Sequence, residues 1–461
     1  MKGTAPISQS LADFVVTQQW EQIPETVRER TKLHILDAIG IAYASTRFEF
    51  AHKTLAALRS FEPGDVDVIG MSARLALRDA VLMNGILVHG LDYDDTYLPG
   101  GVHMAASCFP TALGIGAQLQ SSGKELLTAC LLGMEAGIRL SAASKGGFLK
   151  AGFHASSMVG AFASALTAGR LIMLNSAQLV MAQGIALSTV SGTMQPLQDG
   201  AWAKRMHPGW SAVSGITAAT LACQGFTGSP EAYEGRFGLF SCFLREHAAD
   251  TDWNLVTKDL GQHWEFSRAS IKLYPVCHHL HAFINAALGL AHEHCIDPAE
   301  VESVQALVAE VAVPMVCEPI DVKRAPNSTY ETQFSLPYTI ACSLVRGRFG
   351  LEETGESAYS DPKVLALAQK VSYKIDPKSG FPKFRSGEVI VRMKNGQVLA
   401  RRENIFPDEP AKAEDIVKKF MANATLALST AMAIKIRDLI TGLDQAPDVR
   451  TIGRVLGGSE S

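Results

Sequence analysis

The spacing of apolar residues changes period twice along this chain of 461 residues. Between residues 7 and 267 the apolar positions recur at the three- and four-residue intervals of an amphipathic helix. After residue 270 the pattern becomes alternating, which is typical of strands, and from residue 411 to 441 it is helical again. The order helical, alternating, helical predicts a helical domain with an α+β module inserted into it.

Periodicity and helix-start signals predict seven helices in the first part of the chain. We expect them over residues 24–45, 73–88, 110–119, 123–142, 156–172, 176–189 and 208–223. In the inserted module we expect a strand over 301–316, helices over 333–345 and 362–371, and a hairpin over 387–403. The Asn395-Gly396 pair in that hairpin favours a type I′ turn, with positive φ at both residues.

The chain is too long for one ordinary hydrophobic core, so we expect more than one domain. The predicted protein is mainly α. Residues 1–269, completed by 404–461, form its large all-helical domain, and residues 270–403 form a smaller inserted α+β lid domain.

Composition argues against several classes of partner. The formal net charge is -4 and no run of Lys and Arg exceeds two residues, so we expect no nucleic-acid partner and no attraction to an anionic membrane. The charge-free segment 171–198 is too polar for a membrane span, and the first residues contain no secretory signal pattern. The eight cysteines include no CxxC pair, which indicates reduced thiols and a cytoplasmic location.

The segment His89–His103, HGLDYDDTYLPGGVH, contains two histidines and three aspartates. Its position between two predicted helices indicates a loop, where catalytic residues often lie. Helix capping by the aspartates, metal binding and acid/base chemistry are all compatible with these residue types. A metal site would use His89, Asp92, Asp94 and Asp95, but their spacing matches neither an EF-hand nor HExxH, and we therefore predict no metal.

Basic and aromatic residues cluster at three later points, each at a predicted helix start or at the domain junction. These residues are His154; Lys204, Arg205 and His207; and Lys272, Tyr274, Cys277, His278, His279 and His281. Cations facing an acidic loop suit the removal of a proton next to a carboxylate, because they hold the carboxylate and stabilise the enediolate. We therefore expect a small anionic carboxylate as the substrate.

Some of these residues have a purely structural interpretation as well. His207 could cap the helix that Pro208 opens, and Cys277 could be a packed thiol. Successive positions of a helix diverge by about 100°, so the neighbouring histidines would not share one pocket; we assign His278 to the site and His281 to helix packing. Isolated histidines such as His34 and His52 are predicted to lie in the core.

The motifs HxxDxDDT, FHxxS, KRxHPGW and IKxYPxCxxxH, with a further histidine after the first of them, resemble the MmgE/PrpD family in order and spacing. That family includes 2-methylcitrate dehydratase, cis-aconitate decarboxylase and iminodisuccinate epimerase. The resemblance covers essentially the whole chain. It implies a large helical domain with a smaller lid, a homodimer, and catalysis without a metal or an organic cofactor.

The resemblance also assigns the site. The implied catalytic residues are Asp92, Thr96, His103, His154, Lys204 and Lys272. To these we add as substrate-binding residues Arg205, Tyr274, Cys277 and His278. Lys204, Lys272 and His154 are expected to bind carboxylates, and His103 to act as acid or base with Asp92 orienting it.

The chain departs from the family pattern at two positions. Cys277 stands where the decarboxylases carry histidine, and Asp94 stands where the dehydratases tend to carry asparagine. We expect a lyase for a small di- or tricarboxylate, of the 2-methylcitrate dehydratase type. An epimerase of an iminodisuccinate-like dicarboxylate, a cis-aconitate decarboxylase and a non-catalytic carboxylate-binding protein remain as alternatives.

Overall fold

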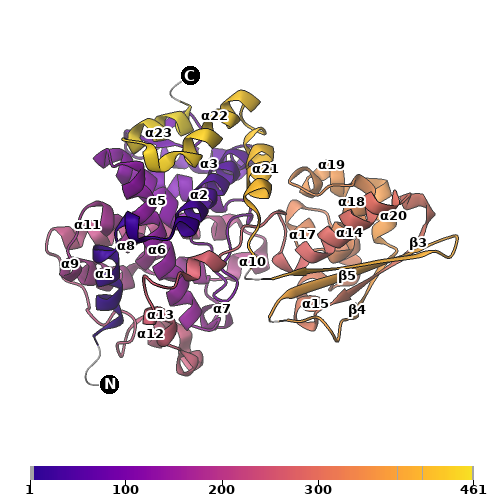
Figure 1. The fold of residues 1–461 in the computed structure, drawn as a ribbon, viewed down its shortest axis with the longest axis horizontal. Coiled ribbons are helices and arrows are strands. Elements are labelled where there is room, and N and C mark those ends of the chain that lie inside the picture. The colour runs from indigo at the N-terminus through magenta and orange to yellow at the C-terminus, as the bar shows by residue number, and fades with distance from the viewer. Residues whose placement is uncertain (1–4, 382, 407–408, 459–461) are drawn as a thin grey trace. The chain divides into compact units, whose positions relative to one another are not determined.

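The computed structural model describes residues 5–381, 383–406 and 409–458, and the chain forms two compact units (Figure 1). Unit 1 consists of Met1–Ile271 and Ala411–Ser461, and unit 2 of Lys272–Pro410. The domain boundaries expected from the periodicity were residues 270 and 403. The chain thus leaves unit 1, forms unit 2 and returns.

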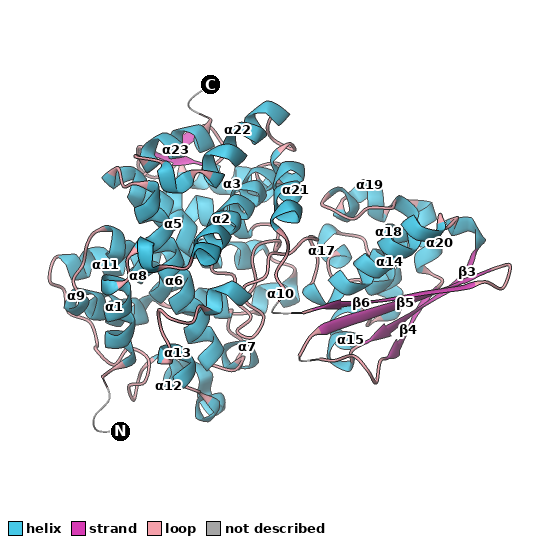
Figure 2. Cartoon of the chain, in the orientation of Figure 1, coloured by secondary structure: helices cyan, strands magenta, loops and turns pink. Residues whose placement is uncertain are grey.

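Unit 1 is built almost entirely of helices (Figure 2). The longer ones are α1 (Ile7–Thr17), α2 (Glu25–Ser45), α3 (Glu49–Leu58), α4 (Leu77–His89), α5 (Ala105–Leu119), α6 (Gly123–Ala143), α8 (Ala155–Leu171), α9 (Ser176–Ala186), α11 (His207–Cys223), α21 (Ala413–Ala424), α22 (Thr430–Thr441) and α23 (Val449–Gly457). Shorter ones are α7 (Gly147–Lys150), α10 (Gln195–Asp199), α12 (Leu239–Leu244) and α13 (Asn254–Thr257). This confirms the mainly α prediction.

Small residues let these helices approach closely. A Cβ atom on Gly85 of α4 would lie 2.5 Å from the Cα atom of Gly209 in α11, so only glycine fits at this crossing. Gly215 of α11 is similar, because its Cβ would lie 2.5 Å from the backbone nitrogen of Ala165 in α8. These contacts bring the start of α11 and the end of α4 together, which places two sequence clusters side by side.

Several predicted boundaries in unit 1 are wrong. Residues 73–75 are not helical but form strand β2 (Ala73–Leu75), which pairs antiparallel with β1 (Val66–Val68). The prediction failed here because so short a strand shows no readable period. Helix α5 begins before Pro110, which lies inside it. The expected helix over 411–441 is interrupted between α21 and α22, where the Ser429 side chain accepts the Met432 N–H and starts a new helix.

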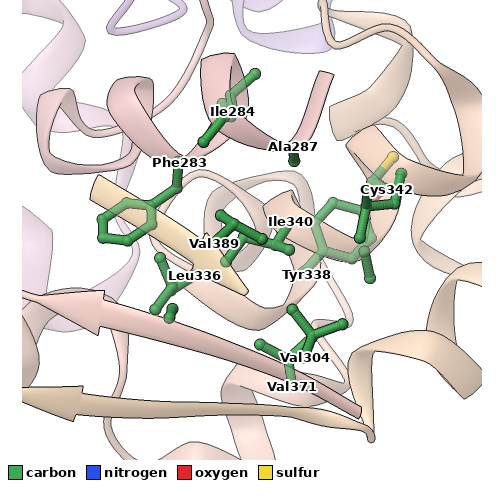
Figure 3. Close-up of a cluster of buried hydrophobic side chains, with 14 of the residues drawn as sticks. Phe283, Ile284, Ala287, Val304, Leu336, Tyr338, Ile340, Cys342, Val371 and Val389 are labelled. Carbon is green, nitrogen blue, oxygen red and sulfur yellow. The ribbon is translucent and has the colours of Figure 1, made fainter. Parts of the chain in front are cut away.

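Unit 2 contains a four-stranded sheet in the order β4-β3-β5-β6. Its strands are β3 (Val301–Val308), β4 (Val371–Ile375), β5 (Arg385–Met393) and β6 (Val398–Ile405); β3 and β4 are parallel and the other neighbours antiparallel. The main helices are α14 (His281–His294), α18 (Leu336–Arg346) and α20 (Pro362–Ala368). Phe283, Leu336 and Val389 belong to the apolar core between helices and sheet (Figure 3).

The strand and hairpin predictions in unit 2 hold only in part. The alternating segment 301–316 is a strand only to Val308, and its end is the short helix α15 (Val313–Val316). Val371 starts β4 instead of ending a helix. The hairpin is confirmed, but Gly396 alone has a positive φ, of 86°, and its N–H donates to the Met393 carbonyl at 2.9 Å. A type I turn followed by a left-handed glycine therefore replaces the expected type I′ turn.

Among the described residues, α6 is the one helix long and apolar enough to cross a membrane by length and composition. Its apolar window is entirely buried within the protein. The core helix of a globular protein has the same properties, and α6 packs against α5 and α8 of unit 1.

Candidate active site

The loop between α4 and α5 carries the acidic segment and is fixed at several points. Thr96 and Ser270 exchange two backbone hydrogen bonds, of 2.7 and 2.9 Å, and the Tyr97 N–H donates to the Val102 carbonyl at 2.9 Å. The Asp95 carboxylate accepts the Ala105 N–H at 3.1 Å, at the first turn of α5. The capping interpretation is therefore right for Asp95, and the loop is held rigidly at its end.

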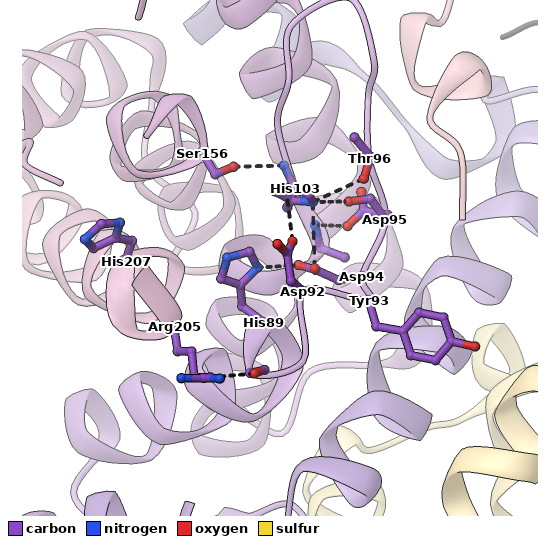
Figure 4. Close-up of polar contacts among 12 residues, drawn as sticks. His89, Asp92, Tyr93, Asp94, Asp95, Thr96, His103, Ser156, Arg205 and His207 are labelled. Carbon is purple, nitrogen blue, oxygen red and sulfur yellow. Dashed lines mark hydrogen bonds and ion pairs between the residues drawn. The ribbon is translucent and has the colours of Figure 1, made fainter. Parts of the chain in front are cut away.

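His103 lies at the centre of this loop with its ring orientation set by the backbone (Figure 4). Its Nδ1 lies 2.7 Å from the Asp95 carbonyl oxygen, which only accepts hydrogen bonds, so Nδ1 carries the proton. In the neutral ring the lone pair is then on Nε2, which lies 3.9 Å from a carboxylate oxygen of Asp92. In this tautomer Nε2 can accept a proton as a general base, and the imidazolium that then forms faces the Asp92 carboxylate.

Asp92 and Lys204 form the more accessible edge of the cluster. The Lys204 ammonium donates to the Asp92 carboxylate at 2.8 Å, and the two side chains are 14% and 26% exposed. Asp92 has a positive φ of 51°, a strained conformation for a residue other than glycine. The backbone thus holds this carboxylate in a fixed place between Lys204 and His103.

Three further histidines surround His103. The His89 Nδ1–H donates to the Asp94 carboxylate at 2.8 Å, and His154 and His207 meet through their Nδ1 atoms at 3.2 Å. Burial lowers the pKa of His154 well below its usual value, with the Lys204 charge adding to the effect, and burial lowers the pKa of His207 to about 4. Both rings are neutral at pH 7, and the buried Nε2 of His154 has no hydrogen-bond partner among the described residues.

A buried charge network lies beneath the loop. Lys419 of α21 pairs with Asp37 of α2 at 2.6 Å and donates to the Tyr93 carbonyl at 2.8 Å. Burial raises the pKa of Asp37 to about 6, and burial together with the neighbouring Asp94 charge raises the pKa of Asp95 to about 7. Helices from both ends of unit 1 therefore support the loop that carries His103.

His89, Asp94 and His103 also come close enough to hold a metal ion, with one ligand atom of each lying within 4.8 Å of the others. The hydrogen bonds argue for a different use of these atoms. A nitrogen that carries a proton does not ligate a metal, so Nδ1 of His103 is excluded as a ligand and only its Nε2 remains. A hydrogen-bonded cluster accounts for the geometry, and the absence of a metal stays a prediction.

The structure brings together five of the predicted site residues, all in unit 1: Asp92, Thr96, His103, His154 and Lys204. The Thr96 hydroxyl lies 3.3 Å from Nδ1 of His103, and the rings of His103 and His154 are 6.1 Å apart. Arg205 lies beside them, with Nε donating to the Gly90 carbonyl at 2.7 Å. This contact fixes the start of the loop, and substrate binding by Arg205 stays a prediction.

The other predicted site residues, Lys272, Tyr274, Cys277 and His278, are among the first residues of unit 2. The Tyr274 hydroxyl donates to the Asn285 side chain at 2.7 Å, and the Cys277 thiol contacts the sulfur of Met315 at 3.5 Å. Their part in the site stays a prediction.

The assignment of His278 to the site and of His281 to helix packing stays a prediction, and the structure places the two rings together. Residues 278–280 form a 3-10 turn and α14 starts only at His281, so the two rings stack on each other at 4.5 Å.

Sequence reasoning missed two features of the cluster. His207 does not cap α11 but begins it and bonds to His154, a role that its place in the KRxHPGW motif already suggested. The Lys419–Asp37 pair had no sequence signal, because the two residues are far apart in the chain. The core prediction is confirmed for His34 and wrong for His52, which is exposed on α3.

Comparison with known proteins agrees with the motifs. The MmgE/PrpD N-terminal domain matches residues 9–252 and the MmgE/PrpD C-terminal domain matches residues 274–445. A cis-aconitate decarboxylase of Aspergillus terreus is 27% identical over 458 residues, which is 95% of this chain and 93% of that protein. Those of Homo sapiens and Mus musculus are 26% and 25% identical, over 98% of this chain and 95% and 93% of theirs. The chain belongs to the MmgE/PrpD family.

Proposed function

We propose that this protein is a lyase for a small di- or tricarboxylate, which moves a proton at the carbon next to a carboxylate without an added cofactor. The observation that carries the proposal is the state of His103. Its Nδ1 proton is held by the Asp95 carbonyl at 2.7 Å, so Nε2 is left to exchange a proton on the side where Asp92 and Lys204 lie. The match to cis-aconitate decarboxylases over nearly the whole chain supports a carboxylate lyase.

The roles follow from charge. When Nε2 takes a proton, the Asp92 carboxylate stabilises the imidazolium that forms. Lys204 binds a substrate carboxylate and stabilises the negative charge that develops on it, while neutral His154 offers a further hydrogen bond through Nε2.

In a dehydration, the electrons of the broken C–H bond expel the hydroxyl group, which leaves as water after protonation. In a decarboxylation, the C–C bond breaks, carbon dioxide leaves, and His103 as the imidazolium protonates the carbon.

Within this class, decarboxylation of cis-aconitate is our first candidate, because the curated relatives carry that name. Dehydration of 2-methylcitrate is the second. It is favoured by Cys277, which stands where the decarboxylases carry histidine. An epimerase would use the same enediolate and return the proton to the other face.

Proton NMR in D₂O separates these activities. The purified protein is incubated with cis-aconitate, citrate, 2-methylcitrate or iminodisuccinate. Loss of carbon dioxide with a new methylene signal means decarboxylation, new alkene signals from a hydroxy acid mean dehydration, and deuterium at a stereocentre without net product means epimerisation. Failure of all four compounds to react or exchange would refute the proposal.

A matched pair of variants ties the chemistry to the site. His103→Gln should abolish most of the reaction, whereas His52→Gln, a change at the exposed histidine of α3, should leave it intact. We also propose that the protein is a cytoplasmic homodimer. Light scattering on the purified protein tests the dimer, and a monomeric mass would contradict it.

A further inference from the structure

Unit 2 contains an arginine that has no acidic partner. Arg385, the first residue of β5, makes no side-chain hydrogen bond and no ion pair with any residue that the structure describes, and its Nε is completely buried. Arg402 on the neighbouring strand is different, because it pairs with Asp376 at 2.8 Å and with Glu388 at 2.6 Å. The sheet thus satisfies one arginine and leaves the other unpaired.

The surroundings of Arg385 are apolar or neutral. It lines a small cavity with seven other residues: His279, Phe283, Val308, Ala309, Ala312, Phe381 and Ser386. Burial lowers the pKa of Arg385, and within the described part of the chain only the Cys277 thiol acts against that effect. His279 adds no charge to these surroundings, because burial and the charge of Arg385 lower its pKa to about 4 and keep the ring neutral at pH 7.

A partly buried guanidinium without a counter-ion opposes folding, because its charge is removed from water. The Phe381 ring, whose centroid lies 6.0 Å from Cζ of Arg385, offsets only part of that cost. Such a group is explained when an anion binds to it. The cavity has about 10 Å³ of accessible space, room for about one water-sized group, so a single carboxylate oxygen fits beside the guanidinium. Cys277, whose thiol acts electrostatically on Arg385, lies in the motif that the family resemblance assigns to the site.

We propose that Arg385 binds a carboxylate group of a small anion, which makes it the centre of an anion site within unit 2. The inference rests on the proposed function for the identity of the ligand as a di- or tricarboxylate. The anion site itself follows from the unpaired guanidinium and its apolar surroundings. His279, which is neutral, is placed to donate a second hydrogen bond to the same carboxylate.

Arg385→Met tests the proposal through stability and binding together, with Arg392→Met as the matched control, an exposed arginine on the same strand. Without ligand, Arg385→Met should melt at the same temperature as the wild type or higher, because an unpaired charge is removed. Citrate should raise the melting temperature of the wild type and of Arg392→Met, but much less that of Arg385→Met. By calorimetry, citrate should bind Arg385→Met about 10- to 100-fold more weakly, the range expected for one charge-assisted contact.

Arg385→Lys keeps the charge and should recover part of the citrate affinity. The proposal is overturned if Arg385→Met binds citrate like the wild type, if it melts well below the control without ligand, or if the wild type binds neither citrate nor cis-aconitate. Citrate binding that depends on Arg385, in a protein that turns over none of the four NMR substrates, would refute the lyase proposal and leave the anion site standing.

Discussion

Replacing Lys419 by methionine should weaken the support of the catalytic loop in a way that depends on pH. The Lys419 ammonium lies 2.6 Å from the Asp37 carboxylate, and both side chains are at most 3% exposed. Removing one partner of a buried ion pair typically costs about 3–5 kcal/mol of the free energy of unfolding. Methionine is close in shape to lysine, so the change tests the charge more than the packing.

The pH dependence follows from Asp37. Burial raises its pKa to about 6 even though the charge and hydrogen bond of Lys419 lower it, so without Lys419 the folded-state pKa rises further. Between its pKa in the unfolded chain and its higher pKa in the folded protein, this carboxyl is protonated only in the folded state. Its contribution to the free energy of unfolding therefore falls as the pH rises through that range. In the wild type this fall ends near pH 6, whereas in the variant it continues, at up to about 1.4 kcal/mol per pH unit. The penalty should therefore be larger at pH 8 than at pH 6.

Urea unfolding at both pH values measures the effect. Lys418→Met is the matched control, because Lys418 is the exposed neighbour on α21. Adding Asp37→Asn to Lys419→Met should recover stability at pH 8, since the carboxylate that lost its partner is then removed. Activity should fall as well, because Lys419 also holds the Tyr93 carbonyl at 2.8 Å. A penalty equal to that of Lys418→Met, or one that does not change with pH, would refute the reasoning.

Three further predictions concern the cluster itself. His103→Gln should lower turnover by about 10²-fold or more while citrate affinity by calorimetry stays near that of the wild type; normal turnover would exclude His103 as the acid or base. Asp95→Asn should make the free energy of unfolding less dependent on pH. With the pKa of Asp95 raised to about 7, the wild type loses on the order of 4 kcal/mol of that free energy between pH 4 and 7. Unfolding titrations at several pH values measure this, and parallel plots of stability against pH for the two proteins would contradict it. Lys204→Met should raise KM for the carboxylate substrate and lower kcat, because it binds the carboxylate and stabilises its developing charge; steady-state kinetics with an unchanged KM would contradict the binding role.

The hairpin and two short strands show where sequence reasoning was sound and where it was not. The hairpin over 387–403 was predictable because alternation and a turn pair act locally, yet the turn type was not, since only Gly396 takes a positive φ. Strand β2, over residues 73–75, was not recognised because three residues carry no readable period. The strand β4 was missed because Val371 also continues the apolar pattern of the helix before it.

The amino-acid sequence alone determined the mainly α character, the order of helical and alternating parts, the family, and the residue types of the site. These properties depend only on the spacing and type of residues that are close together in the chain. Only the tertiary structure decided the tautomer of His103, the meeting of His154 with His207, and the support of the loop by Asp37 and Lys419. The first of these depends on how the loop folds back on itself, and the other two join residues that are distant in the chain and depend on how closely the helices pack. The same is true of Arg385, whose lack of a partner is a property of the folded surroundings and leaves no mark on the sequence.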